Sequence, residues 1–210
     1  MLIGVWLATG LLGCRETQPR SYSEVAFKPN QNPSGTMGAG GMPPMMNASP
    51  IDIKVTWTLP EAWIIKDSAT GMRVGSFAAP DPELRNTGEM DPSAVDVSVV
   101  QLAGDAGGLK ANIMRWMGQV GIKATSEEIE AMIKTAGHIK TKSGQDGMLI
   151  DLTEKLSGDM TQSKSIYGAI IATDDYTVFV KAMGERERVV KIKSEVKTFC
   201  ESLIIAGPKA

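Results

Sequence analysis

A segment without charged residues, residues 29–50, limits where a folded domain can lie in this chain. Its sequence is PNQNPSGTMGAGGMPPMMNASP, with five of the chain's 11 prolines, four glycines and no large apolar residue except methionine. Such a composition cannot offset the backbone entropy lost on ordering, so we expect residues 14–50 to form a disordered tether. The chain has 210 residues, which leaves residues 51–205 for one globular domain.

The first 14 residues have the features of a secretory signal. Met1 to Gly13 carry no charged side chain, and 13 residues are too few for a membrane-spanning helix, which takes about 20. A short apolar run that ends in small residues is typical of a signal peptide, which we assign to residues 1–13. The tetrapeptide Leu11-Leu12-Gly13-Cys14 resembles a bacterial lipobox.

The lipobox resemblance implies cleavage before Cys14 and acylation of that cysteine, with palmitate among the attached chains. Anchoring by more than one acyl chain is stable, so the resemblance predicts a lipoprotein of the cell envelope. The residue directly after the lipobox cysteine is Arg15 rather than aspartate. In a Gram-negative lipoprotein, the resemblance then implies that the protein lies on the periplasmic face of the outer membrane. The segment departs from the signal pattern because no Lys or Arg precedes the apolar run. The alternative is a buried N-terminal helix with an ordinary core cysteine.

Composition excludes several classes of protein. The net charge of −2 gives no basic surface for nucleic acid, and two cysteines with one histidine cannot build a disulfide scaffold or a four-ligand zinc site. We therefore expect no metal and no other cofactor in the domain. Thioether sulfurs do bind Cu(I), so a Cu(I)-binding tether stays an alternative, although neither His nor Cys supports it. The tether methionines are Met37, Met42, Met45 and Met46.

Hydrophobic periodicity predicts an α+β domain. Alternation and turn residues predict a mainly antiparallel sheet of about six or seven strands, joined by short turns and flanked by helices. Helical spacing of apolar residues predicts three helices, of which the second begins with a capping box formed by Thr125 and Glu128 and the last is long. The predicted strands are 51–58, 71–79, 95–102, 138–142, 147–153, 164–172 and 176–183, and the predicted helices are 107–120, about 125–136 and about 185–203.

One motif resembles a known group of proteins. Residues 104–108 read GDAGG, and residues 112–121 read NIMRWMGQVG. They are similar to a motif, Asn-x-x-Arg-Trp-x-x-Gln-x-Gly, of uncharacterised bacterial secreted proteins and lipoproteins, which also tend to carry counterparts of Trp63 and of Met72-Arg73. The order of elements resembles the Mog1/PsbP-like fold. The resemblance implies no catalytic activity, since members of the wider fold act mostly as binding or assembly factors.

The same motif supplies the candidate binding face. Asn112, Arg115, Trp116 and Gln119 stand at positions i, i+3, i+4 and i+7 of a predicted helix and therefore share one face. Trp and Arg are enriched at interface hot spots, and an indole with amides also suits a sugar ring.

A structural role for this helix is the open alternative. Trp116 would then pack under the sheet with Ile113 and Val120, and Arg115 would pair with Asp105 or Asp96.

No catalytic residues can be assigned from the sequence. His138 is the sole histidine, and its convergence with Asp105 and Asp151 would indicate a hydrolase of envelope polymers. Cys200 is expected to be a buried, inert thiol. An acidic loop could hold Ca²⁺, although its spacing matches no EF-hand and a solvated loop is favoured. The acidic residues of that loop are Asp81, Glu83, Glu89 and Asp91.

Together these patterns predict a cell-envelope lipoprotein whose domain is a non-catalytic binding or assembly module. We expect the partner to be another envelope protein, with a glycan as the second choice. The alternatives are the hydrolase and the Cu(I)-binding tether.

Overall fold

The computed structural model describes residues 55–66, 72–85, 91–154 and 164–206. The predicted signal peptide, Cys14 and the methionines of the tether lie outside the described residues, as does Glu89 of the acidic loop. Within the described ranges, no helix is long and apolar enough to cross a membrane.

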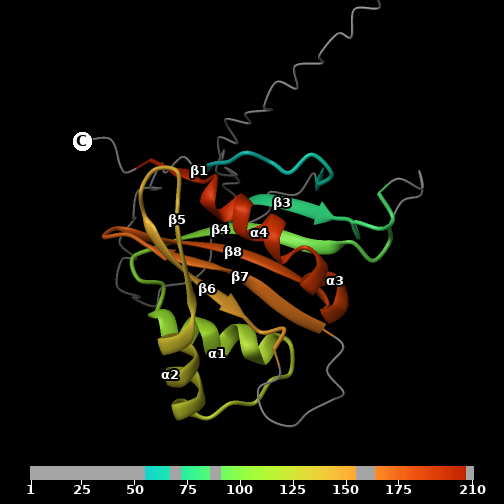
Figure 1. Cartoon of the computed structure of the whole chain (residues 1–210). Coiled ribbons are helices and arrows are strands. Elements are labelled where there is room, and N and C mark those ends of the chain that lie inside the picture. The colour runs from blue at the N-terminus through green and yellow to red at the C-terminus, as the bar shows by residue number, and fades with distance from the viewer. Residues whose placement is uncertain (1–54, 67–71, 86–90, 155–163, 207–210) are drawn as a thin grey trace, which may run out of the picture.

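A seven-stranded antiparallel sheet forms the centre of the domain (Figure 1). Its strands lie in the order β2-β3-β4-β8-β7-β6-β5, and every neighbouring pair is antiparallel. The predicted fold class, an antiparallel sheet flanked by helices, is confirmed. The strands are β2 (Ile64–Ile65), β3 (Arg73–Ala79), β4 (Val95–Ala103), β5 (Gly137–Lys140), β6 (Asp146–Asp151), β7 (Lys164–Ala172) and β8 (Tyr176–Glu185).

Helices cover both faces of this sheet (Figure 1). On one face α3 (Arg186–Lys191) and α4 (Lys193–Glu201) pack against β7 and β8. Their apolar residues join the aromatic cluster of Trp57, Trp63, Phe77 and Phe199 in the larger part of the core. On the other face α1 (Leu109–Gln119) and α2 (Ser126–Thr135) close a second, smaller core over β6, β7 and β8. The predicted capping box of Thr125 and Glu128 is present at the start of α2.

The C-terminal helix differs from the prediction. Instead of one long helix over residues 185–203, the chain forms α3 and α4 with a break at Ile192, where φ is −103° and ψ is 5°. Val189, Ile192 and Val196 are nevertheless fully buried. The break lets both segments keep their apolar residues on a twisted sheet, whereas a straight helix would diverge from its surface.

A small second sheet brings the two ends of the domain together. Strand β1 (Val55–Thr56) pairs antiparallel with β9 (Ile204–Ile205), with Val55 opposite Ile205. The strand predicted over 51–58 is therefore short where it is described, and it does not belong to the main sheet. Neither β9 nor β2 was predicted, because a two-residue strand has no detectable periodicity.

Candidate functional site

The helix motif singled out in the sequence mainly supports the loop before α1. The Asn112 side chain is 1% exposed, and its Nδ2 donates to the carbonyl oxygens of Ala106, at 3.2 Å, and Gly108, at 2.8 Å. Its Oδ1 accepts a hydrogen bond from the Arg115 guanidinium. The loop needs this support because Gly104, Ala106, Gly107 and Gly108 all have positive φ, a region that residues other than glycine rarely adopt.

Trp116 belongs to the core of the domain. Its side chain is 5% exposed, its ring meets Phe179 of β8 edge-on at a centroid distance of 6.3 Å, and Ile113 and Val120 join the same cluster. In this position the indole offers no face for a sugar ring. This packing agrees with the alternative in which Trp116 packs under the sheet and does not bind a partner.

The two remaining residues of the motif are exposed. Gln119 accepts a hydrogen bond from the Lys181 ammonium at 2.7 Å, and burial, together with the nearby Arg73, lowers the pKa of Lys181. Among the described residues, Arg115 forms no ion pair with Asp105 or Asp96, and Asp96 binds Lys66 and Arg73. The four predicted residues thus share one helix face, but only two of them, Arg115 and Gln119, are exposed to solvent.

A groove lies at the end of the sheet where α1 begins. Three segments form it: the β4–α1 loop, the β5–β6 hairpin and the turn between β7 and β8. Two adjoining hollows make up the groove, with volumes of about 290 and 450 Å³, and Asp146 and Ala172 line both. The smaller one, here called the apolar hollow, is lined by Asp105, Gly108, Leu109, Asn112, His138, Asp146, Gly147, Met148, Ile170, Ala172 and Thr177.

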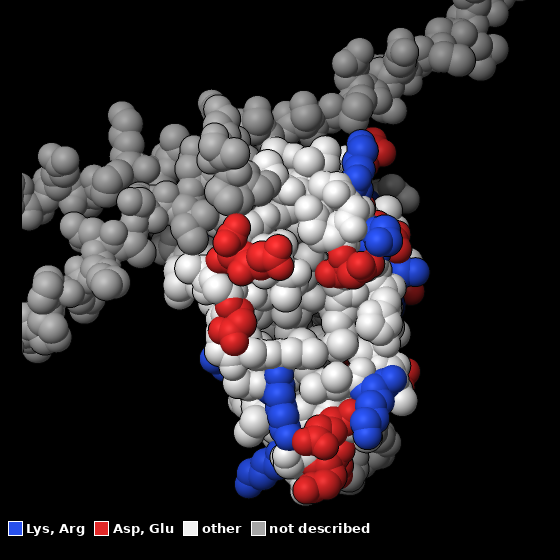
Figure 2. Space-filling model, turned by 90° about the vertical axis from the view of Figure 1, so that its left-hand side faces the viewer, with Lys and Arg blue, Asp and Glu red and all other residues white. Residues whose placement is uncertain are grey.

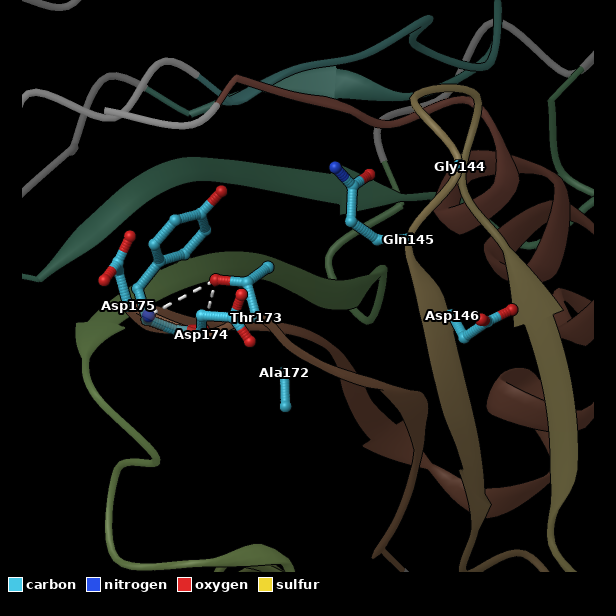
Figure 3. A pocket seen from close by; sticks show the side chains of 8 residues that line it. Gly144, Gln145, Asp146, Ala172, Thr173, Asp174 and Asp175 are labelled. Carbon is cyan, nitrogen blue, oxygen red and sulfur yellow. Dashed lines mark hydrogen bonds between the residues drawn. The ribbon is translucent and has the colours of Figure 1, made fainter. Parts of the chain in front are cut away.

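Hydrogen bonds join the β4–α1 loop to the β7–β8 turn, and the pairing of β6 with β7 positions the hairpin beside that turn. The amide of Gly104 donates to the carbonyl oxygen of Asp175 at 2.7 Å, and the Thr177 hydroxyl donates to the carbonyl oxygen of Gly104 at 2.8 Å. Thr173 closes the β7–β8 turn through its hydroxyl, which donates to the carbonyl oxygen of Tyr176 at 2.9 Å (Figure 3). In the hairpin, Gly144 takes a φ of +95° that the tight turn requires. The groove is therefore preformed.

Four carboxylates surround the groove. In the view of Figure 3, Asp174 and Asp175 lie on one side of the larger hollow and Asp146 on the other. The fourth, Asp105, lines the apolar hollow and accepts a hydrogen bond from the amide of Gly107 at 3.0 Å. Figure 2 looks onto this side of the molecule and shows acidic side chains on its upper part, whereas the lower end carries both acidic and basic side chains. Among the described residues, ion pairs reach only Asp146 of the four, through Lys140 at 3.0 Å.

Two of the three predicted hydrolase residues meet in the apolar hollow. His138 and Asp105 both line it, whereas Asp151 lies outside its lining and pairs with Lys193. The sequence analysis did not single out Asp146, Asp174 or Asp175. Turn residues between strands were visible in the sequence, but the meeting of three turns distant in the sequence was not.

The predicted acidic loop is a structural element rather than an open cation site. Asp81 binds Lys191 at 3.0 Å, and Asp91 binds Arg188 at 2.7 Å, so α3 neutralises both carboxylates. The amide of Glu83, followed by Lys191, holds the pKa of Asp81 below its usual value. No group of three or more potential metal ligands occurs in the described part of the chain.

Cys200 is fully buried, and this burial raises the pKa of its thiol. The packing agrees with the expected inert thiol.

Comparisons with known proteins identify no family. No family model matches the chain, and no curated protein matches it. Among solved structures, the chain is similar to the solution structure of cyanobacterial PsbP (CyanoP) from Synechocystis sp. PCC 6803, with a TM-score of 0.39 and 14% sequence identity. The match covers 83% of this chain and 100% of that chain. That neighbour has the PsbP-like fold to which the sequence resemblance points, but a similarity this distant carries no conclusion about function.

Proposed function

We propose that the domain is a non-catalytic binding module and that the groove is its binding site. The observation that supports this most directly is the apolar hollow, a depression at the end of the sheet where α1 begins. Although His138 and two carboxylates line it, no hydrogen bond joins the imidazole to either one in the described structure.

We further propose that a lipid on Cys14 anchors the domain in the cell envelope and that its partner is another envelope protein. Substitution Cys14→Ala should release the protein from the membrane fraction and abolish incorporation of a labelled fatty acid. Unchanged fractionation and labelling of the variant would overturn the anchor and leave the proposal for the groove intact.

Photo-crosslinking in intact cells tests the binding site. A photoreactive amino acid would replace His138, an exposed residue that lines the apolar hollow. Matched probes at Gln119, on α1, and at Lys197, on α4, serve as controls, since both positions are exposed and lie outside the lining of the groove. We expect a discrete adduct at His138 alone, and mass spectrometry would identify the partner. An adduct at Gln119 alone would instead indicate that the binding site is the face of α1 that carries Gln119.

A hydrolase of envelope polymers is the second candidate, because His138, Asp105 and Asp146 line one hollow. Purified protein would be incubated with cell-wall polymers and the products separated by chromatography. Fragments released by the wild type but not by His138→Ala would favour the enzyme over the binding module. We expect no such difference.

A further inference from the structure

The lining of the apolar hollow indicates what kind of group it can receive. Its lining includes the apolar side chains of Leu109, Met148 and Ile170. Its two buried polar side chains are already satisfied: Thr177 donates to Gly104, and the Asn112 amide bonds to the β4–α1 loop. A sugar would bring hydroxyl groups that need partners, whereas an aliphatic side chain needs none. The buried part of the hollow therefore suits an aliphatic side chain better than a sugar ring.

The charge around the groove restricts the partner further. Asp105, Asp174 and Asp175 have no ion-pair partner in the described structure, and Asp146 forms an ion pair with the exposed Lys140. Acidic groups around an apolar depression attract a basic partner and repel an acidic one. The rim thus complements Lys and Arg side chains that flank an apolar one.

We infer that the groove binds a basic segment of the partner protein, with one aliphatic side chain in the apolar hollow and flanking Lys or Arg side chains at the four carboxylates. This inference rests on the proposed function of the groove as a binding site. It adds the chemistry of the partner and excludes an acidic segment or a glycan as the occupant.

Peptide binding to the purified full chain tests the inference. The probe is fluorescent acetyl-Lys-Lys-Leu-Arg-Lys-amide, and fluorescence anisotropy gives its Kd. Two comparison peptides replace either the leucine with glycine or all four basic residues with glutamate. We expect the leucine peptide to bind most tightly, the glycine peptide about tenfold more weakly, and the acidic peptide not at all. Affinity should also fall as salt is added, because the rim is exposed.

Charge-matched variants locate the binding. The double variant Asp174→Asn/Asp175→Asn should weaken binding of the leucine peptide by about tenfold. The control Glu127→Gln/Glu187→Gln removes the same charge from α2 and α3, outside the groove lining, and should leave the Kd within about twofold of the wild type. Substitution Lys140→Ala should strengthen binding by about twofold, because it frees Asp146.

Equal affinity for the basic and acidic peptides would overturn the inference, and so would an unchanged Kd in the Asp174→Asn/Asp175→Asn variant. If no peptide binds while the crosslink at His138 persists, the basic segment is excluded and the groove remains a binding site. If the adduct at His138 is a polysaccharide, the occupant is a glycan and the inference fails. If neither peptide binding nor the crosslink at His138 is observed, both the proposed function of the groove and the inference are overturned.

Discussion

Trp116 shows how a single residue can look functional in a sequence and support the core in the structure. Its indole fills the space between α1 and Phe179, and it is nearly inaccessible to solvent. Removing a buried aromatic side chain loses its transfer free energy and leaves a cavity.

We predict that Trp116→Ala lowers the free energy of unfolding by about 3–5 kcal/mol. The matched change on the same helix, Gln119→Ala, removes one exposed hydrogen bond from Lys181 and should cost less than about 1 kcal/mol. Urea unfolding followed by circular dichroism measures both. Equal stability of the two variants would contradict the buried position of the indole.

Gly168 is a second residue whose role is structural. A Cβ atom at this position would lie 2.1 Å from the carbonyl oxygen of Val180 on the neighbouring strand β8. The obstacle is backbone rather than a flexible side chain, so β7 and β8 would have to separate locally.

Substitution Gly168→Ala should therefore destabilise the domain by about 3 kcal/mol or more. Gly118→Ala is the control, because a Cβ there meets nothing within 4 Å and Gly118 lies in α1. Alanine is the better helix former, so this change should stabilise by up to about 1 kcal/mol. Thermal melting compares the two variants, and opposite shifts of Tm are expected.

At the scale of elements, ion pairs connect the end of β3 and the start of β4 to α3. Asp81 is buried, the side chain of Asp91 is only 2% exposed, and the two carboxylates bind Lys191 and Arg188 respectively. Burial alone would raise the pKa of Asp91, but the amides of Asp81 and Ser93 and the Arg188 guanidinium outweigh it and lower the pKa. Both aspartates therefore have a lower pKa in the folded protein than in the unfolded chain.

A lowered carboxyl pKa gives stability that is complete above the unfolded value of about 4 and is lost as the pH falls through the folded value. We predict that Asp91→Asn is less stable than the wild type at neutral pH and that the difference narrows below about pH 4. Urea midpoints at a series of pH values test this. A stability difference between Asp91→Asn and the wild type that stays constant down to about pH 3 would contradict the role of the Asp91–Arg188 ion pair.

The sequence predicted regular elements well where periodicity was long. The strand predicted over 164–172 coincides with β7, and the hairpin of β5 and β6 lies within about two residues of its predicted bounds. The break at Ile192 was missed because neither Gly nor Pro marks it, and the helical spacing of buried residues continues through it.

The candidate site was much harder to predict than the fold. Its rim comes from residues 105, 146, 174 and 175, which lie on three separate connections. Local patterns identify such turns but not the tertiary contacts that place them together, such as the bond between Gly104 and Asp175. The helix motif was detected because its four residues are close in sequence, and two of them proved to be buried.

At the scale of the whole molecule, Cys200 can report on opening of the core. The thiol is fully buried in the larger core cluster, where burial raises its pKa and so disfavours the reactive thiolate.

We predict that a Cys14→Ala protein labels with a thiol reagent only as fast as the domain unfolds. Labelling kinetics with and without guanidinium chloride give the measurement. Rapid labelling of the native protein would contradict the packing around Cys200.

The pairing of β1 with β9 places the entry and exit of the chain side by side, since Val55 lies opposite Ile205. Such partners have Cα atoms about 5 Å apart, so a short peptide could join them. New ends could then be opened at Gly121, in the exposed turn between α1 and α2, to give a circular permutant with the same contacts. The same geometry would let the whole domain be inserted into a surface loop of a host protein.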